Sequence, residues 1–567
     1  MADQGTGRSA AWEPMAAEGL REPREQAVSV EGLRLKYPGE ERLTFKDVSF
    51  KAAPGEKVLL LGPSGCGKST LLQVLSGMIP KATEVPMKCE NRQLPRSWAY
   101  VFQDPDTQFC MPYVDEELAF VLENLAVPRD EMKARMREAL DAVGLHLKEL
   151  HMPISHLSQG MKQRLALASA LLLEPEVLFL DEPSALLDPE GRRQIWEAVK
   201  RVSAGRTLII VEHRIEEMAD YVDRIVLFGP DGVILGEGPP KEVFARYESE
   251  LKSYGIWYPG VWEDYAASRA GQQWFPRIAS SSAAGSLSSL EPVVASSGEG
   301  RGRPDQENEV VNPYASVSAN RCSREPQITL QSFAGQRRSQ PVIALDHAEV
   351  FPGDYVAILG PNGAGKSSLL LSLMGLLPSE GTYILGGEHV VKGKRKKLRK
   401  RREQQLRQIG FVFQNPELQF VTERVGDEVA YSLLVDGMPA SEAEEASRSI
   451  LERFGLHGLE GRHPYQLSTG QKRRLSVATA MARQPSVLLL DEPTFGQDAR
   501  NTFAILEMCE QLRRSGTAIL MVTHELQIAE MAATHIWEIR EGRVVSQKVS
   551  PRLHAAESDM ALAEVSS

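Results

Sequence analysis

The stretch VLLLGPSGCGKST, residues 58–70, decides the fold of this chain. Four apolar residues typical of a β-strand run into a glycine-rich turn, which ends at Lys68 and Ser69 and leads into a leucine-rich helical segment. The pattern Gly-x4-Gly-Lys-Ser in this setting is typical of a phosphate-binding loop, because glycines let consecutive backbone N–H groups point inward around phosphate oxygens. The stretch therefore predicts an α/β domain with a nucleotide site at the end of a strand.

The second half of the chain repeats this stretch and four others in the same order. VAILGPNGAGKSS at residues 356–368 matches the first stretch, and Ser158 to Asp181 spans 23 residues, as does Ser468 to Asp491. Five ordered blocks with matched spacing indicate a duplicated domain. The other four pairs are VFQDPDTQF (101–109) with VFQNPELQF (412–420), LSQGMKQRL (157–165) with LSTGQKRRL (467–475), VLFLDEPSALLD (177–188) with VLLLDEPTFGQD (487–498), and IIVEHR (209–214) with LMVTHE (520–525).

Short strand-like runs alternate with helical patterns in each copy. This alternation favours an α/β fold around a largely parallel sheet, with the motifs at the carboxyl edge where ligands bind. The region between the copies is rich in Ser, Ala, Gly and Pro and indicates a flexible linker. The predicted segments are a flexible leader (1–27), a first domain (28–245), an aromatic-rich appendage (246–277), the linker (278–325), a second domain (326–548) and a C-terminal tail (549–567).

The composition excludes several classes of protein. The 567 residues carry 65 Lys+Arg against 76 Asp+Glu, a net charge of −11, which disfavours a nucleic-acid coat protein. A hydrophobic content of 42% excludes wholesale disorder. No apolar run approaches the ~18 residues that a membrane span needs, and the first residues lack the apolar core of a signal peptide. We expect a cytoplasmic protein whose five cysteines form neither a disulfide nor a zinc site.

An acidic pair follows an apolar strand in each copy, Asp181-Glu182 and Asp491-Glu492. An aspartate there can hold Mg²⁺ together with the phosphate-loop serine, and the adjacent glutamate can polarise an attacking water. Such a pair alone is a weak signal, because it is often only surface charge. Its recurrence at the same position in both copies removes most of that doubt.

LSQG at 157–160 and LSTG at 467–470 each precede a basic helix, and they resemble the signature motif of ATP-binding cassette (ABC) ATPases. The resemblance covers roughly residues 28–245 and 326–548. It implies two tandem P-loop NTPase domains, each with a mainly parallel sheet core, an antiparallel β subdomain and a helical subdomain. It also implies that the domains pair head to tail, so that each ATP lies between the phosphate loop of one copy and the signature motif of the other.

The same resemblance assigns roles residue by residue. It implies that Glu182 and Glu492 are catalytic, that His213 and His524 are switch histidines that contact the γ-phosphate, and that Gln103 and Gln414 contact Mg²⁺ and water. The Mg²⁺ ligands are then Ser69, Gln103 and Asp181 in one site and Ser367, Gln414 and Asp491 in the other. ATP-binding residues are Tyr37, Gly62, Pro63, Ser64, Gly65, Cys66, Gly67, Lys68, Ser69 and Thr70 facing Ser468 and Gly470, and Phe333, Gly360, Pro361, Asn362, Gly363, Ala364, Gly365, Lys366, Ser367 and Ser368 facing Ser158 and Gly160.

Three positions in these sites need comment. Tyr37 resembles the aromatic residue that stacks on adenine, and Phe333 is its expected counterpart, although the segment before the second phosphate loop differs in length. Cys66 is either a reactive thiol or a packed side chain. Asp188 and Asp498 occupy loops that link the two sites in this family. Because both copies keep the glutamate, the histidine and a signature motif, we predict two hydrolytic sites.

The residues after the loop glutamines resemble the ATPase subunits of energy-coupling factor (ECF) importers of vitamins and metal ions. They are QDPDTQF (103–109) with VDEELAF (114–120), and QNPELQF (414–420) with VGDEVAY (425–431); TFGQD (494–498) also resembles the fused double ATPase of that group. The resemblance implies a peripheral protein on the inner face of the cell membrane. Its partners are then a transmembrane scaffold subunit and a small membrane subunit that binds the substrate.

Two alternatives to this function remain: another ABC importer ATPase, or a soluble tandem ATPase that acts on the ribosome or on nucleic acid. The Ser/Gly-rich linker and the acidic total disfavour the soluble factor, and no nucleic-acid partner is expected. The basic run 392–402 could indicate nucleic acid, but a solvated hairpin or helix face is preferred. For the aromatic appendage we prefer packing on its own domain to a partner-binding surface. The cargo is not encoded in these residues.

Overall fold

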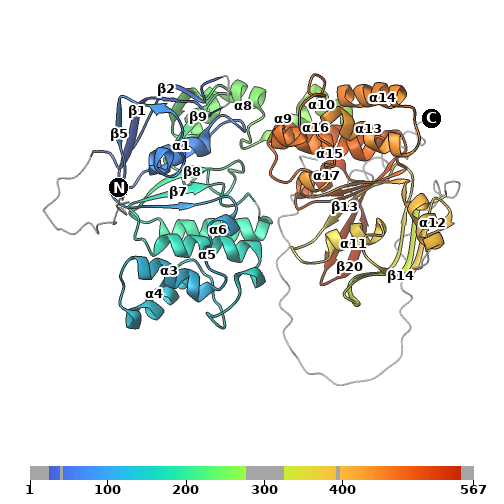
Figure 1. Ribbon diagram of the computed structural model, residues 1–567, viewed down its shortest axis with the longest axis horizontal. Helices are drawn as coiled ribbons and strands as arrows, with labels where there is room; N and C mark the ends of the chain where they lie inside the picture. Colours follow the sequence, from blue (N-terminus) through green and yellow to red (C-terminus); the bar gives the residue numbers. More distant parts are fainter. Residues whose placement is uncertain (1–24, 39–41, 186, 276–324, 391–395, 551–567) are drawn as a thin grey trace, which may run out of the picture.

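The computed structural model describes residues 25–38, 42–185, 187–275, 325–390 and 396–550 (Figure 1). Most of the predicted leader, linker and C-terminal tail lies outside these ranges. The two copies form two α/β units side by side, repeat 1 (28–245) and repeat 2 (326–548), which confirms the predicted fold class. None of the described helices has both the length and the apolar character that crossing a bilayer needs.

A six-stranded sheet forms the core of repeat 1, in the order β10-β9-β3-β8-β7-β6. Its strands are parallel except β10 at one edge. Every residue of β7 and β8 is buried, as is usual when helices cover both faces of a parallel sheet. The bounds are β3 (Lys57–Leu61), β6 (Trp98–Val101), β7 (Val177–Asp181), β8 (Thr207–Val211), β9 (Arg224–Phe228) and β10 (Ile234–Gly238).

A small antiparallel sheet and a set of helices complete repeat 1. The strand β1 pairs with β2, β4 and β5. The strands are β1 (Val28–Leu35), β2 (Phe45–Ala52), β4 (Met87–Lys88) and β5 (Asn91–Gln93). The helices are α1 (Lys68–Ser76), α2 (Met78–Lys81), α3 (Val114–Asn124), α4 (Arg129–Ala142), α5 (Gln159–Leu171) and α6 (Pro189–Val202).

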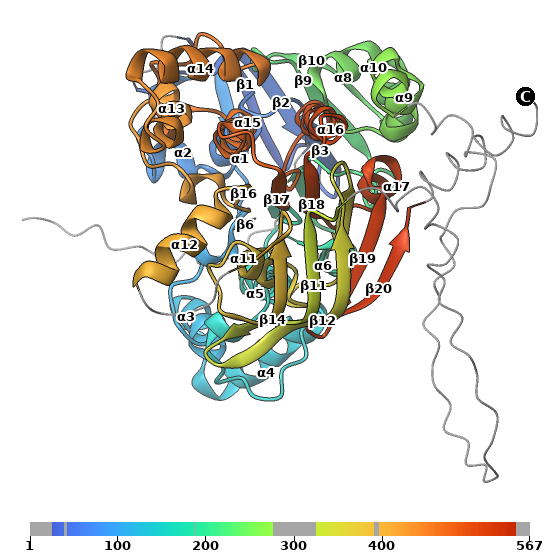
Figure 2. The same cartoon turned by 90° about the vertical axis from the view of Figure 1, so that its right-hand side faces the viewer.

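In repeat 2 the two corresponding sheets join into one of ten strands, ordered β15-β14-β11-β12-β20-β19-β13-β18-β17-β16 (Figure 2). The junction is a single residue pair between β12 and β20, Ala344 with Arg543. The strands are β11 (Ile328–Arg337), β12 (Gln340–Val350), β13 (Tyr355–Leu359), β14 (Ser379–Leu385), β15 (Glu388–His389), β16 (Ile409–Val412), β17 (Val487–Asp491), β18 (Ala518–Val522), β19 (His535–Arg540) and β20 (Arg543–Val549).

Seven helices surround the described part of the second sheet. The basic run enters α12, where Lys397, Lys400 and Arg401 are exposed, as expected for a solvated helix face; residues 392–395 lie outside the described residues. The helices are α11 (Lys366–Leu373), α12 (Lys396–Leu406), α13 (Val425–Val435), α14 (Ala440–Arg453), α15 (Thr469–Met481), α16 (Ala499–Arg514) and α17 (Leu526–Ala532).

The aromatic appendage packs on repeat 2 as well as on its own domain, where the Tyr247 hydroxyl donates to Leu235 O at 3.1 Å, so the preferred interpretation is only partly right. After α7 (Pro240–Arg246) come α8 (Glu248–Tyr254), α9 (Val261–Ala267) and α10 (Arg269–Trp274), and α9 and α10 lie beside α16 (Figure 1). The ring of Tyr265 stacks on that of Phe503 with centroids 3.8 Å apart and planes 2° apart, and Trp262 meets the same ring edge-on at 5.0 Å. Aromatic contacts of this kind stabilise beyond the area that they bury.

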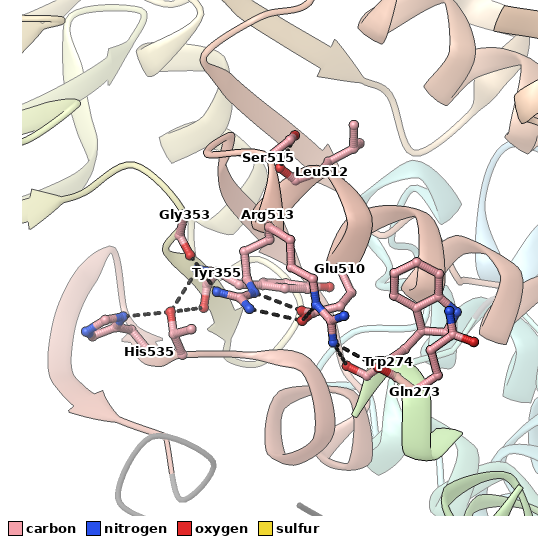
Figure 3. A network of polar contacts seen from close by, with 11 residues as sticks. Gln273, Trp274, Gly353, Tyr355, Glu510, Leu512, Arg513, Ser515 and His535 are labelled. Carbon is pink, nitrogen blue, oxygen red and sulfur yellow. Dashed lines mark hydrogen bonds and ion pairs between the residues drawn. The ribbon is translucent and has the colours of Figure 1, made fainter. Parts of the chain in front are cut away.

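The end of the appendage is held by an arginine at the end of α16. Arg514 Nη2 donates to the carbonyl oxygens of Gln273 at 3.0 Å and Trp274 at 2.9 Å (Figure 3). The Arg514 Nε donates in turn to Glu510, a fully buried carboxylate that also accepts from Arg513. Because a buried carboxylate needs paired charges, both arginines are fixed, and the appendage is anchored to a rigid point of repeat 2.

Candidate active sites

The two phosphate loops have the same shape. In repeat 1 the chain leaves β3 and α1 begins at Lys68, directly after Gly67 with a φ of 100°. A Cβ on Gly67 would lie 2.8 Å from a ring atom on β2, so only glycine fits there. Lys68 Nζ donates to the carbonyl oxygens of Gly62 at 2.8 Å and Pro63 at 3.0 Å. Lys366 of repeat 2 makes the equivalent two bonds at the same two distances.

Two of the three predicted Mg²⁺ ligands, the serine and the aspartate, are hydrogen-bonded to each other in both repeats, whereas the predicted glutamine ligand bonds the adjacent glutamate. Ser69 Oγ donates to Asp181 Oδ1 at 2.7 Å, and Ser367 Oγ donates to Asp491 Oδ1 at 3.0 Å. Hydroxyl and carboxylate oxygens at the end of a phosphate loop are the ligands that Mg²⁺ prefers when it also binds substrate phosphates. The residues present therefore fit Mg²⁺-ATP at both sites.

Each predicted catalytic glutamate is held by the predicted histidine and glutamine. In repeat 1, His213 Nε2 lies 3.1 Å from Glu182 Oε1, and Gln103 Nε2 donates to Glu182 Oε2 at 2.9 Å. In repeat 2 the same atoms of His524 and Gln414 lie 2.9 Å and 3.0 Å from Glu492. In each repeat a histidine and a glutamine, which follow two different strands, thus contact the carboxylate of a glutamate that follows a third strand.

The backbone at both glutamates is strained. Glu182 has a φ of 48° and Glu492 a φ of 49°, in the left-handed region that side chains other than glycine rarely adopt. The backbone N–H of each donates to the last residue of the neighbouring strand, to Val211 O at 2.9 Å and Val522 O at 3.1 Å. Strain that is maintained in this way is typical of catalytic positions.

Residues of each repeat reach the phosphate loop of the other. Gly496 of repeat 2 lines a cavity of about 970 Å³ together with Tyr37, Lys68 and His213 of repeat 1. In the opposite direction, the backbone N–H of Asn362 in the second phosphate loop donates to Asp188 Oδ2 at 3.3 Å. The loops that end at Asp498 and Asp188 therefore connect the two sites.

The signature serines begin the helices that follow them. Ser158 Oγ accepts from Met161 N at the start of α5, and Ser468 Oγ accepts from Gln471 N at the start of α15, each at 3.3 Å. Gly470 approaches Asn501, where a Cβ would lie 2.2 Å from the side-chain nitrogen. Neither Ser468 nor Gly470 is among the described residues that line the cavity at the first phosphate loop. Their contact with ATP, and that of Ser158 and Gly160, stays a prediction.

The predicted adenine-stacking residue of repeat 1 lies at the site, but that of repeat 2 does not. Tyr37 lines the cavity, and its hydroxyl lies 3.1 Å from Thr70 Oγ1. Phe333 is fully buried between β12 and β14, edge-on to Tyr383 at 6.0 Å, and has no exposed face for a base. The assignment of Phe333 is therefore wrong.

The strand register explains this correction and identifies another residue. Leu35 pairs with Phe45 in repeat 1, and Gly335 pairs with Ile343 in repeat 2. These pairs are equivalent, because Phe45 and Ile343 each pack beside the last glycine of the phosphate loop in their own repeat. Two residues beyond Leu35 and Gly335 are Tyr37, just after β1, and Arg337, the last residue of β11. Phe333 instead takes the position of the buried Leu33, and in repeat 2 an arginine stands where repeat 1 has the aromatic residue.

Comparison with known proteins supports the same reading of the two repeats. A family model described as ABC transporter matches residues 45–185 and 346–495. This chain belongs to the ABC transporter family. "Putative HMP/thiamine import ATP-binding protein YkoD" of Bacillus subtilis (strain 168) is 36% identical over 530 residues, which cover 90% of this chain and 89% of that protein. A "Putative ABC transporter ATP-binding protein" of Methanosarcina acetivorans is 32% identical over 534 residues, covering 91% and 85%.

A solved structure shares the tandem fold of this ABC protein at lower identity. It is the complex of the archaeal ribosomal stalk protein aP1 with the ribosome recycling factor aABCE1, with a TM-score of 0.53 and 20% identity over 89% of this chain and 88% of that chain. At this identity the likeness concerns the fold alone. The family membership makes the chain an ATPase with two ATP-binding domains.

The electrostatics of the ABC sites suit hydrolysis. Burial acts to raise the pKa of Glu182, but the nearby His213 and Lys68 outweigh burial and lower that pKa below its usual range. The carboxylate is therefore ionised at neutral pH and can orient and polarise a water. Burial raises the pKa of Asp491 to about 6 and raises the pKa of Asp181 as well. Bound Mg²⁺ supplies the charge that neutralises developing charge on the phosphate oxygens.

The two ABC sites differ in residues that no motif marks. In repeat 1, Tyr100 donates to Asp181 Oδ2 at 2.8 Å; in repeat 2 the same position on the strand is Phe411. The buried Arg473 donates to the carbonyl oxygen of Gln414 at 2.6 Å, and burial lowers its pKa to about 10. Its counterpart in repeat 1 is the neutral Gln163. Only a position-by-position comparison of the two copies could have revealed these differences.

Proposed function

We propose that this chain is the ATP-hydrolysing subunit of an ECF-type importer. It drives uptake of a vitamin, a vitamin precursor or a transition metal ion through separate transmembrane subunits, from the inner face of the membrane. The support comes from the resemblance after the loop glutamines and from the 36% identical relative, which is named as an HMP/thiamine import ATP-binding protein. The observation that carries the proposal is an exposed apolar surface beside Gln414.

This surface, here called the docking patch, consists of Leu418, Val421, Tyr431, Leu434 and Val435. Leu418 is 72% exposed and Val421 67%, on the segment that runs from Gln414 to α13. Tyr431, Leu434 and Val435 are also exposed and are spaced three and four residues apart, so they share one face of α13. Exposed apolar side chains gathered in this way mark an interaction site.

The position of the docking patch links it to catalysis. Leu418 and Val421 lie on the short segment that begins at Gln414, which bonds Glu492, and this segment leads into α13 with the other three patch residues. A partner helix seated there is therefore mechanically connected to the second ATP site. ATP binding closes the two domains, hydrolysis and release of phosphate open them, and the patch passes this motion to the membrane subunits.

The corresponding surface of repeat 1 is more polar. Phe120 is 37% exposed at the position of Tyr431. Thr107, Cys110, Glu123 and Asn124 stand at the positions of the other four patch residues. We infer that the two repeats receive two different segments of the scaffold subunit, the more apolar one on repeat 2.

The test is co-purification from gently solubilised membranes of the host, with the tagged double variant Glu182→Gln, Glu492→Gln and ATP. We expect two small hydrophobic membrane proteins, of which the substrate-binding one identifies the cargo class. Adding Leu418→Asp and Val421→Asp should abolish their recovery. The matched control is Val545→Asp on β20, which is 54% exposed and remote from Gln414 in the sequence. Ribosomal subunits without membrane proteins would instead favour the soluble tandem ATPase.

A further inference from the structure

The residues that follow the two switch histidines form an ion pair between the repeats. Arg214 comes directly after His213, and Glu525 comes directly after His524. The Arg214 Nη2 lies 2.6 Å from Glu525 Oε1, with only 17% and 10% of the two side chains exposed. Both residues line a cavity of about 50 Å³ that also contains the catalytic Glu182 and Glu492. The pair therefore spans the space between the two hydrolytic centres.

The appendage also contacts Arg214. The Arg214 guanidinium lies 3.8 Å from the ring centroid of Trp257, which is 1% exposed. Trp257 Nε1 donates to the carbonyl oxygen of Gln497 at 2.9 Å. Gln497 is next to Gly496, which lines the cavity of the first ATP site. Arg214 thus contacts the second switch loop directly and, through Trp257, the loop of repeat 2 that faces the first site.

The charges at these equivalent positions are opposite. If the two repeats were identical, two like charges would face each other here, and their repulsion would destabilise the contact. In this chain an arginine faces a glutamate instead. Glu525 Oε2 is buried without a hydrogen-bond partner among the described residues, so Arg214 is the main group that compensates this carboxylate. The residue before the switch histidine also differs between the repeats. Glu212 of repeat 1 accepts from the backbone N–H of His213 at 3.0 Å, and the corresponding residue of repeat 2 is Thr523.

We propose that Arg214 is a positioning residue that couples the two ATPase sites through its ion pair with Glu525. A movement of one switch histidine toward bound ATP displaces its neighbour in the chain, and the buried ion pair transmits that displacement to the other switch loop. Each site then turns over in a way that depends on the state of the other. The inference rests on the ATPase activity of both repeats but does not require the import function.

The experiment uses the purified full chain without membrane partners, so failure of the importer proposal does not affect it. ATPase rates are measured against ATP concentration for the wild type, Arg214→Glu, Glu525→Arg and the double charge swap. We expect each single variant to lower kcat by at least about fivefold, a typical coupling between sites, and to bring the Hill coefficient to about 1. The double swap should restore both values to within about twofold of the wild type.

The control for a general charge effect is Arg193→Glu on α6, where the arginine is 58% exposed and pairs with Glu190. It should change neither value. If the charge reversals fail to fold, Glu525→Gln and Arg214→Gln remove the charges with little change in size, and a loss of cooperativity with retained ATP binding is expected. Wild-type cooperativity in the single variants, or a double swap no better than the worse single one, would overturn the proposal.

Discussion

Tyr100 donates a hydrogen bond to Asp181 at 2.8 Å, and this contact has no equivalent at Asp491, because Phe411 stands at the corresponding position. The two ATP sites of one chain therefore hold their predicted Mg²⁺ ligands differently. Loss of a group that orients a metal ligand commonly lowers the affinity for the metal by about 10-fold or more.

Replacement of Tyr100 by Phe should weaken Mg²⁺ binding at the first site only. In a Glu492→Gln background, where the first site does the hydrolysis, we expect the Mg²⁺ concentration for half-maximal activity to rise about 10-fold. In a Glu182→Gln background the same substitution should have no effect, which serves as the control. An equal change in both backgrounds would show that the hydroxyl acts on the whole fold.

Both glutamates that are predicted to be catalytic should contribute to turnover. Glu182→Gln and Glu492→Gln each keep the hydrogen-bonding shape but remove the carboxylate that polarises water. We expect each single variant to lose a substantial part of the ATPase rate and the double variant to lose about 10²–10⁴-fold. The measurement is phosphate release by the purified chain. A single variant that keeps the full wild-type rate would contradict the prediction of two hydrolytic sites.

The second site should respond to pH through Asp491. Burial raises its pKa to about 6, above the ordinary value of 3.8, so the folded chain holds this proton more tightly than the unfolded chain does. The proton stabilises the fold below about pH 4, and that stabilisation is lost as the pH rises through about 6. Mg²⁺ binding has the opposite dependence, because the ion needs the carboxylate.

Asp491→Asn tests this dependence. At pH 7 the variant should melt at a higher temperature than the wild type in the absence of Mg²⁺, since it carries no buried charge, while hydrolysis at the second site is lost. The difference in melting temperature should shrink as the pH falls below about 6. A variant that melts lower than the wild type at pH 7 would show that the carboxylate is stabilised by its surroundings.

Tyr37 and Phe333 should behave differently although they were predicted to be counterparts. Tyr37→Ala should weaken ATP binding at the first site by about 1–3 kcal/mol, the usual contribution of an aromatic residue stacked on a base, with little change in stability. Phe333→Ala should destabilise the fold by about 3–5 kcal/mol, because it opens a cavity in the core. Nucleotide titration and chemical denaturation of both variants separate the two effects.

Much of the site could be predicted from local sequence. The phosphate loops and the Asp-Glu pairs depend on residues within one strand, one turn and one helix, so their spacing in the chain already specifies their geometry. Duplication strengthened each motif, because a chance pattern does not recur at a matched distance. Lys68, Ser69, Asp181 and Glu182 consequently lie where they were expected, as do their partners in repeat 2.

Contacts between distant segments could be decided only by the folded chain. Trp257 bonds a residue 240 positions away, and the preference of the appendage for α16 depends on an aromatic face that exists only after repeat 2 has folded. Phe333 is a core residue because it stands on β11 at the position of the buried Leu33 of β1, and only the strand register reveals this equivalence. The pair of Arg214 with Glu525 likewise requires two packed domains, since opposite charges far apart in sequence interact only when tertiary structure brings them together and removes them from water.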